Sequence, residues 1–203
     1  DTVQPIDDRA AASDTLNYEN PDFGLNFRFK AMDFTQVNLA MNRKLVRTAV
    51  LKLQAESGSR VLDLFCGIGN FSLALAAQGY DVLGVEAAAE AIDRARLNAR
   101  LNGLEARCEF AVQDLYDADC LNLGKADYLL LDPPRSGAGP NLRAWLDNSE
   151  ARRGVYVSCS PASFASDAAV LQQAGFVLEQ VGIYDMFPHT AHVETLGVFQ
   201  KPW

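Results

Sequence analysis

The chain has 203 residues, of which 49% are hydrophobic and 22% charged, and its net charge at pH 7 is −8. This length suits one sizeable hydrophobic core, so we expect a single domain with an N-terminal extension. The acidic balance is unfavourable for unaided binding of a polyanion, because non-specific affinity for nucleic acids comes largely from Lys and Arg. No window approaches the roughly 20 apolar residues of a membrane span, and the polar first residues lack a signal-peptide pattern. We therefore expect a cytoplasmic protein with no membrane partner.

The four cysteines are scattered along the chain without a C-x-x-C pair; they are Cys66, Cys108, Cys120 and Cys159. This spacing argues against a structural zinc site, an iron–sulfur cluster or a disulfide framework. His189 and His192 lie close together, but they provide too few ligands for a metal site. We expect no metal in this chain, and any special cysteine must act alone.

The first part of the chain divides into two segments. Residues 1–22 are acidic, polar and without periodicity, which predicts a tail or linker. Residues 23–56 begin with alternating apolar residues, as in an extended segment or hairpin arm. Asn38 then stands where it can cap a helix that runs to about Gln54. Residues 57–203 form the main domain.

Strand-like and helix-like segments alternate from Arg60 onward. Strands are expected at 60–65, 81–86, 106–112, 126–132 and 153–159, helices at 70–78, 88–102, 140–149 and 161–174, and a weak turn near 115–120. The alternation predicts a doubly wound parallel sheet with right-handed crossovers. The last two strands, 176–187 and 194–201, are joined too closely for a parallel crossover, so they form an antiparallel hairpin. This arrangement predicts the seven-stranded Rossmann-like α/β fold of methyltransferases rather than a dehydrogenase sheet.

The stretch from Val61 to Phe71 joins a buried strand to a helix through Gly67-Ile-Gly69. Glycines at such a turn let a ligand approach the backbone, and the N–H groups at the start of the helix supply donors. A dinucleotide fingerprint would have a third glycine, which is missing here. The stretch therefore predicts a nucleotide-binding corner of another kind.

Acidic residues end or follow four expected strands: Asp63, Glu86, Asp114 and Asp132. We expect them to gather along the carboxyl edge of the sheet, where ligands of such sheets bind. They would repel a pyrophosphate but suit S-adenosylmethionine, which carries a sulfonium and an ammonium. Glu86 is then the expected ligand of the ribose hydroxyls. Any single one of these acids could instead be a helix cap.

The segments around Asp132, Cys159 and Glu194 contain residues that could take part in a reaction. Asp132-Pro-Pro-Arg135 holds its aspartate on a stiff loop, and the arginine stands where enzymes that methylate exocyclic amines have an aromatic residue. Cys159 ends a strand beside Pro161, which suits the first turn of a helix whose dipole would favour the thiolate. A plain core cysteine is the alternative. Glu194 would serve as a base if it were partly desolvated, and would otherwise be a solvated carboxylate.

The chain resembles the RNA uracil-5-methyltransferases, and most closely the branch that methylates uridine in 23S ribosomal RNA. The matching stretches are 33–38, 63–71, 98–103, 132–137, 155–159 and 185–194. The resemblance implies that residues 57–203 are the catalytic domain, that Cys159 is the nucleophile and that Glu194 is the base. It also implies contacts with S-adenosylmethionine, which together with the glycine turn would come from Gln36, Phe65, Gly67, Gly69, Asn70, Glu86, Asp114 and Asp132.

Some features depart from that family. Ser160 stands where members usually have Asn, and the N-terminal RNA-binding β-barrel and iron–sulfur cysteines that members often carry are not in this sequence. The RNA affinity is therefore expected from a missing N-terminal domain. RNA cytosine-C5 methylation would require a second cysteine after the fourth strand, where none is found. That activity, amino-group methylation and a non-catalytic cofactor- or RNA-binding module remain alternatives, and the oligomeric state is open.

Overall fold

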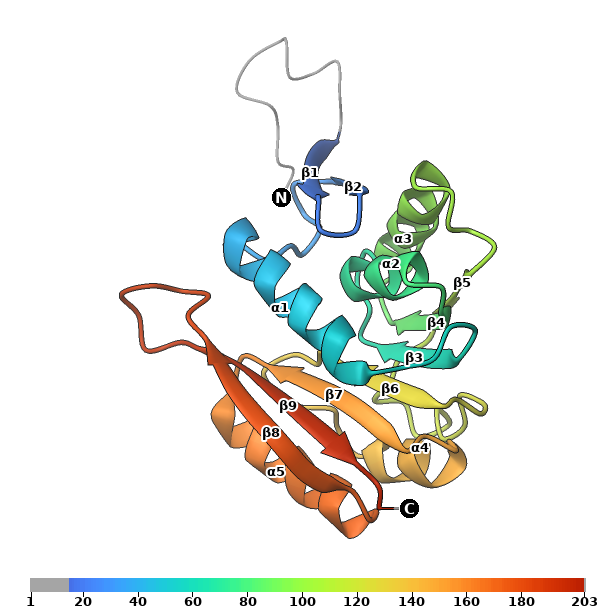
Figure 1. Ribbon diagram of the computed structural model, residues 1–203, viewed down its shortest axis with the longest axis vertical. Coiled ribbons are helices and arrows are strands. Elements are labelled where there is room, and N and C mark those ends of the chain that lie inside the picture. The colour runs from blue at the N-terminus through green and yellow to red at the C-terminus, as the bar shows by residue number, and fades with distance from the viewer. Residues whose placement is uncertain (1–14, 203) are drawn as a thin grey trace.

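The computed structural model describes residues 15–202. Its main sheet has seven strands in the order β5-β4-β3-β6-β7-β9-β8 (Figure 1). These strands are β3 (Arg60–Leu64), β4 (Asp81–Glu86), β5 (Cys108–Val112), β6 (Tyr128–Leu131), β7 (Arg153–Ser158), β8 (Val177–Tyr184) and β9 (Glu194–Gln200). Strands β3 to β7 pair in parallel, whereas β9 runs antiparallel to both β7 and β8. The predicted mostly parallel sheet with a C-terminal antiparallel hairpin is confirmed.

Helices cover both faces of this sheet (Figure 1). They are α1 (Leu39–Leu53), α2 (Asn70–Ala77), α3 (Ala89–Leu101), α4 (Leu142–Asn148) and α5 (Pro161–Gln173). Successive side chains of a strand point to opposite faces, so Val61 packs in the core under α1 to α3 while Leu62 and Leu64 pack in the core under α4 and α5. The segment 115–120 forms turns, as its sequence predicts.

Helix α1 begins and ends where its sequence predicts. The Asn38 side chain caps it by accepting a hydrogen bond from the Met41 N–H at 3.1 Å, and Gln54 closes it in the left-handed conformation at φ 51°. One face of the helix is buried, through Leu45, Val46, Ala49, Val50 and Leu53. The helix therefore packs as an amphipathic element against the sheet.

The prediction of a tail over residues 1–22 is wrong for its last part, because β1 (Leu16–Asn20) pairs with β2 (Leu25–Phe29) in an antiparallel hairpin. Residues 1–14 lie outside the described part of the chain. The strand forms despite its polar sequence because Tyr18 stacks on Phe27, with ring centroids 4.7 Å apart. Both rings are buried, so tertiary packing outweighs the weak local propensity.

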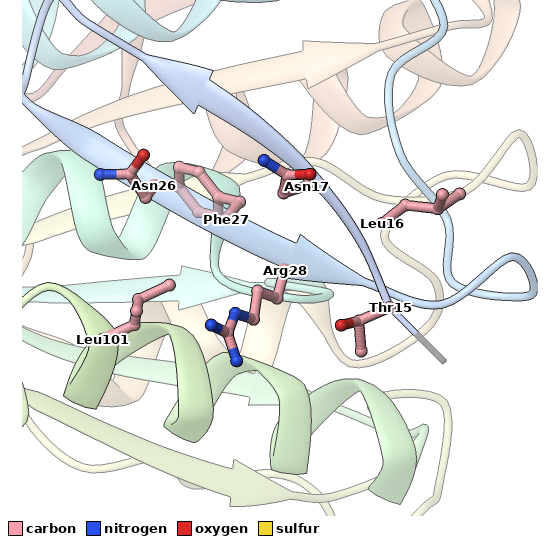
Figure 2. A pocket seen from close by; sticks show the side chains of 7 residues that line it. All are labelled: Thr15, Leu16, Asn17, Asn26, Phe27, Arg28 and Leu101. Carbon is pink, nitrogen blue, oxygen red and sulfur yellow. The ribbon is translucent and has the colours of Figure 1, made fainter. Parts of the chain in front are cut away.

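Helix α3 holds this hairpin through two asparagines one turn apart. Asn98 accepts from the Arg28 N–H at 2.9 Å and donates to the Arg28 carbonyl, while Asn102 bonds the N–H and carbonyl of Asn26 in the same way. The free edge of β2 is thereby satisfied by amide side chains that mimic a neighbouring strand. A groove of about 450 Å³ remains between the hairpin and α3, and none of the expected site residues lines it (Figure 2). Within residues 15–202, the helices are all too short or too polar to span a bilayer.

Candidate active site

The turn after β3 is built from left-handed backbone. Phe65, Gly67 and Gly69 have φ angles of 65°, 53° and 89°. A Cβ on Gly69 would lie 2.6 Å from the Leu73 Cδ1 atom, whereas a Cβ on Gly67 would meet nothing within 4 Å. Gly69 therefore allows α2 to start close against its neighbours, and Gly67 is needed for its backbone conformation alone.

This contrast gives a stability prediction. Gly69→Ala should lower the free energy of unfolding by about 2 to 4 kcal/mol, because it adds both left-handed strain and a clash. Gly67→Ala adds the strain alone and should cost about 1 to 2 kcal/mol. Denaturant unfolding of the two variants checks the difference. Equal costs would show that Leu73 moves aside freely.

Three expected cofactor residues meet around this turn. The Glu86 carboxylate, at the end of β4, accepts the Gly67 N–H at 3.3 Å and the Ala88 N–H at 3.0 Å. Asp114 is exposed and accepts the Tyr116 N–H at 2.8 Å, and the Tyr116 ring lies 5.9 Å from the Phe65 ring. Phe65, Glu86 and Asp114 therefore lie at one edge of the sheet, as the strand ends predict.

The expectation that Asp63 joins them at the edge is wrong. Its side chain is fully buried within β3 and accepts a hydrogen bond from the Ser72 hydroxyl of α2. Burial raises the pKa of Asp63 to about 7, although the Ser72 hydrogen bonds oppose the shift. Asp63 therefore binds the start of α2 inside the core, next to the glycine turn, and does not lie at the ligand edge.

Gln36 and Asn70 differ in how their amides are used. Gln36 is buried, and among the described residues its Oε1 atom has no hydrogen-bond partner. Asn70 exchanges two hydrogen bonds with Asn42 and accepts a third from the Tyr18 hydroxyl at 3.1 Å. Gln36 therefore has an oxygen available for a ligand, while the Asn70 side chain ties α2 to α1 and the hairpin. Contact between Asn70 and a cofactor stays a prediction.

Cys159 and Glu194 lie at neighbouring positions at one end of the paired strands β7 and β9. Ser158 of β7 is paired with Thr195 of β9, so the next residues outward, Cys159 and Glu194, face each other at the carboxyl edge. Glu194 is only 3% exposed, and its Oε2 atom has no hydrogen-bond partner in the described structure. Burial raises the pKa of this carboxyl to about 7. A buried carboxyl that titrates near neutral pH is suited to proton transfer.

Asp132 belongs to the same cluster. It follows β6, and burial together with the nearby charges of Glu194 and Asp63 raises its pKa to about 8. The carboxyls of Asp132 and Glu194 thus lie close enough to interact. Asp132 lies at the point where the predicted cofactor edge meets the cysteine.

The electrostatics of Cys159 differ from the prediction. The cysteine directly precedes α5, as expected, but burial raises the pKa of its thiol and Glu194 raises it further. Arg135 acts in the opposite direction by hydrogen bonding and by its charge. The predicted effect of the helix dipole is therefore outweighed, and the thiolate depends on Arg135.

The placement of Arg135 beside the sulfur is a feature that the sequence did not reveal. Its Nη2 atom lies 2.7 Å from the His192 Nδ1 atom, so the loop before β9 also contacts the guanidinium. The sequence feature that could have indicated it is the pair of prolines before Arg135, because they stiffen the loop that carries the arginine. Among residues 15–202, no group of three or more His, Cys, Asp or Glu side chains could hold a metal ion.

Ser160 fills the place of the asparagine that is usual in the family. It is the N-cap of α5, and its Oγ accepts the Ser163 N–H at 3.3 Å. Its own N–H donates to Ser158 Oγ at 3.1 Å. Serine and asparagine cap helices about equally well, so the start of α5 is supported in this chain too.

The strand order and the glycine turn define the class of seven-stranded, S-adenosylmethionine-dependent methyltransferase folds. Comparison with known proteins makes this more specific. The chain belongs to the tRNA (Uracil-5-)-methyltransferase family, whose model matches residues 8–202. The resemblance seen in the sequence is therefore confirmed.

Curated relatives include the 23S rRNA (uracil(1939)-C(5))-methyltransferases RlmD of Azoarcus sp. strain BH72 and of Bordetella avium strain 197N. The first is 47% identical over 206 residues, and the match covers 100% of this chain and 47% of the relative. The second is 46% identical, with 99% and 43% covered. The chain thus spans about half the length of the curated relatives it matches.

Solved structures agree with this assignment. The tRNA (uracil-54, C5)-methyltransferase of Pyrococcus abyssi, in complex with S-adenosyl-L-homocysteine, is 29% identical with a TM-score of 0.81, and the match covers 92% of this chain and 44% of that one. A SAM-dependent O-methyltransferase of Thermotoga maritima is 18% identical, with a TM-score of 0.62 and coverage of 79% and 66%. The second likeness shows the fold alone.

Proposed function

We propose that this chain is the catalytic part of an enzyme that methylates C5 of uracil in RNA with S-adenosylmethionine as the methyl donor. The observation that carries the proposal is the Cys159–Glu194 pair at the carboxyl edge of the sheet, where β7 ends beside the start of β9. The names of the relatives support 23S ribosomal RNA as the substrate. A cytoplasmic location is proposed on the same support.

The residues expected to bind the cofactor carry groups that fit S-adenosylmethionine. The unpartnered Gln36 oxygen supplies a buried acceptor, and Glu86 and Asp114 are carboxylates that suit the hydroxyls and positive charges of this molecule. Gly67 leaves room beside its backbone, Gly69 lets α2 start close to this turn, and Phe65 offers an aromatic face. When bound, the donor supplies an electrophilic methyl group. Asn70 and Asp132 complete the proposed set.

Cys159 makes the first bond in the proposed mechanism. C5 of uracil is a weak nucleophile, so the thiolate first attacks C6, and the electrons of the C5–C6 double bond move toward the C4 carbonyl. C5 then has enolate character and takes the methyl group, displacing S-adenosylhomocysteine as the S–C bond of the donor breaks. Arg135 beside the sulfur favours the thiolate that this step requires.

Glu194 completes the reaction. It removes the proton from C5, the double bond reforms, and the cysteine leaves C6 with the electrons of the S–C bond. The pKa of about 7 lets Glu194 accept a proton at neutral pH and lose it again afterwards. The uracil must leave its stack to reach this edge, at a cost of a few kcal/mol.

Charge and length bear on how the RNA is bound. A chain with net charge −8 has little electrostatic attraction for RNA. Because this chain spans about half of its curated relatives, we infer that the remainder of the whole protein supplies most of the RNA affinity. The proposed RNA-binding domain belongs to that remainder.

Trapping with 5-fluorouridine tests the proposal. The whole protein, given 5-fluorouridine-containing ribosomal RNA and S-adenosylmethionine, should form an adduct that survives denaturation, because C5 then carries fluorine in place of the proton that the base must remove. Mass spectrometry of the digest should place the nucleotide on the Cys159 peptide. Cys66→Ala, which changes a buried cysteine of the glycine turn, should still trap RNA. An adduct on another residue, or none with the whole protein, would overturn the proposal.

A further inference from the structure

Asp167 is a buried acid that the proposed reaction does not use. It lies on α5 and is 8% exposed. Its Oδ2 atom accepts the backbone N–H of Ala138 at 2.7 Å and also the hydroxyl of Tyr156. A buried carboxylate is costly unless it is well hydrogen-bonded, and here one of its two partners is the backbone of a loop. This loop begins at Arg135.

The loop is pressed against α5 at its centre. Gly137 has a φ of 87°, and a Cβ at this position would lie 2.6 Å from Asp167 Oδ2 and 3.3 Å from Ser163 Cβ. Tyr116 also fixes the loop, because its hydroxyl donates a hydrogen bond to the Gly137 carbonyl. The backbone is thus fixed by a side chain of α5 and by one from the segment after β5.

These contacts with the loop backbone determine the position of the Arg135 side chain. Its side chain is exposed at the surface and contacts His192, so little packing restrains it. Prolines 133 and 134 fix the loop before the arginine, and the hydrogen bond that the Ala138 N–H donates to Asp167 fixes it after. A shift of this backbone would carry the guanidinium away from Cys159.

We propose that Asp167 is a positioning residue whose carboxylate holds the 136–138 backbone so that Arg135 stays beside the Cys159 sulfur. The inference rests on the proposed function only in taking Cys159 as the reactive thiol. Asp167 touches neither sulfur nor substrate, and it acts through the loop. The charged groups that face Cys159 directly are Arg135, Glu194 and Asp132.

Alkylation of Cys159 tests this inference without RNA or methyl donor. The whole protein is treated with iodoacetamide across pH 6.5 to 10, and the Cys159 peptide is quantified by mass spectrometry. Asp167→Ala should move the midpoint of its reactivity to higher pH by about one unit, because the thiolate loses its guanidinium partner. At pH 7.5 this corresponds to a roughly tenfold slower reaction. Asp167→Asn keeps an acceptor for the Ala138 N–H and should restore most of the wild-type profile.

A double-mutant comparison separates positioning from general loss of structure. Arg135→Gln should shift the Cys159 profile by itself, and Asp167→Ala added to it should shift the profile no further. Tyr156→Phe removes the partner of Asp167 that does not belong to the loop, so its profile should match the wild type. If Asp167→Ala does not fold, Asp167→Asn is measured alone and in the Arg135→Gln background. The pH midpoint of Cys159 reactivity should then shift by less than it does in Arg135→Gln.

Two results would overturn the inference. One is an unchanged Cys159 profile in Asp167→Ala that melts at a lower temperature, since this would show a purely structural role. The other is an equal additional shift in the Arg135→Gln background, since Asp167 would then act independently of the arginine. Failure of the proposed function would appear elsewhere, as the lack of an RNA adduct in the wild-type protein.

Discussion

Cys159→Ala should reduce methyl transfer to ribosomal RNA by at least about 10,000-fold in the whole protein, because without a thiolate nothing activates C5 of uracil. Transfer of a radiolabelled methyl group from S-adenosylmethionine to RNA measures the loss. Binding of the methyl donor should be nearly unchanged, since the expected cofactor residues lie on other strand ends. The variant therefore separates chemistry from binding.

Cys108→Ala is the matched control for this variant. Cys108 begins β5, which is separated from β7 in the sheet by β4, β3 and β6. Burial raises the pKa of its thiol to about 12, so it carries almost no thiolate at neutral pH. Its replacement should leave the rate within about threefold of the wild type, as expected for a substitution away from the site. Activity of Cys159→Ala within tenfold of the wild type would rule out the covalent mechanism.

The fold follows closely from patterns in the sequence. The apolar run from Val61, the glycine turn and the strand–helix alternation all report local structure, and these elements form where they are expected. The missed strand β1 has a different cause. Leu16-Asn-Tyr-Glu-Asn20 has weak strand propensity, and it is held by the stacking of Tyr18 on Phe27 and by the pairing with β2. Contacts of this kind leave no periodic trace.

The candidate site could be predicted to a lesser degree. Cys159 and Glu194 stand at strand ends, and topology alone brings them to one edge. Asp63 also stands near a strand end, but the pleat turns it inward under α2, where it meets Ser72. Asp167 lies in mid-helix without any motif. Its role depends on a side-chain contact with a distant loop, which spacing along the chain does not encode.

The electrostatics of Cys159 do not follow from its position in the sequence. A helix N-terminus favours a thiolate, yet desolvation and the carboxyl of Glu194 raise the pKa of Cys159. The same two residues are linked in the proposed reaction. Once Glu194 has taken the C5 proton, its charge no longer acts on the sulfur, so the cysteine leaves C6 more easily as a thiolate. Proton and sulfur chemistry are thereby coupled across the β7–β9 pair.

Glu194→Gln should separate the two halves of the reaction. The nucleophile and methyl transfer remain, but nothing removes the C5 proton, so a methylated protein–RNA adduct should accumulate even with ordinary uridine. Turnover should fall by about 100- to 10,000-fold, the usual contribution of a general base. Denaturing gels of the whole protein with labelled RNA measure the adduct, and Cys159→Ala in the same background should abolish it. Rapid turnover by Glu194→Gln without an adduct would assign the base elsewhere.

The pH dependence of adduct breakdown tests whether Glu194 is the base. Burial raises the pKa of Glu194 to about 7, so below that pH the folded protein holds the carboxyl protonated and unable to accept the C5 proton. The rate of adduct resolution in the wild type should therefore rise as pH increases from about 6 to 8 and level off once Glu194 is ionised. Because Asp132 titrates at about 8 and interacts with Glu194, the midpoint belongs to the pair. In Glu194→Gln this rise should vanish while slow resolution persists, since the group whose ionisation controls the step has been replaced by a neutral amide.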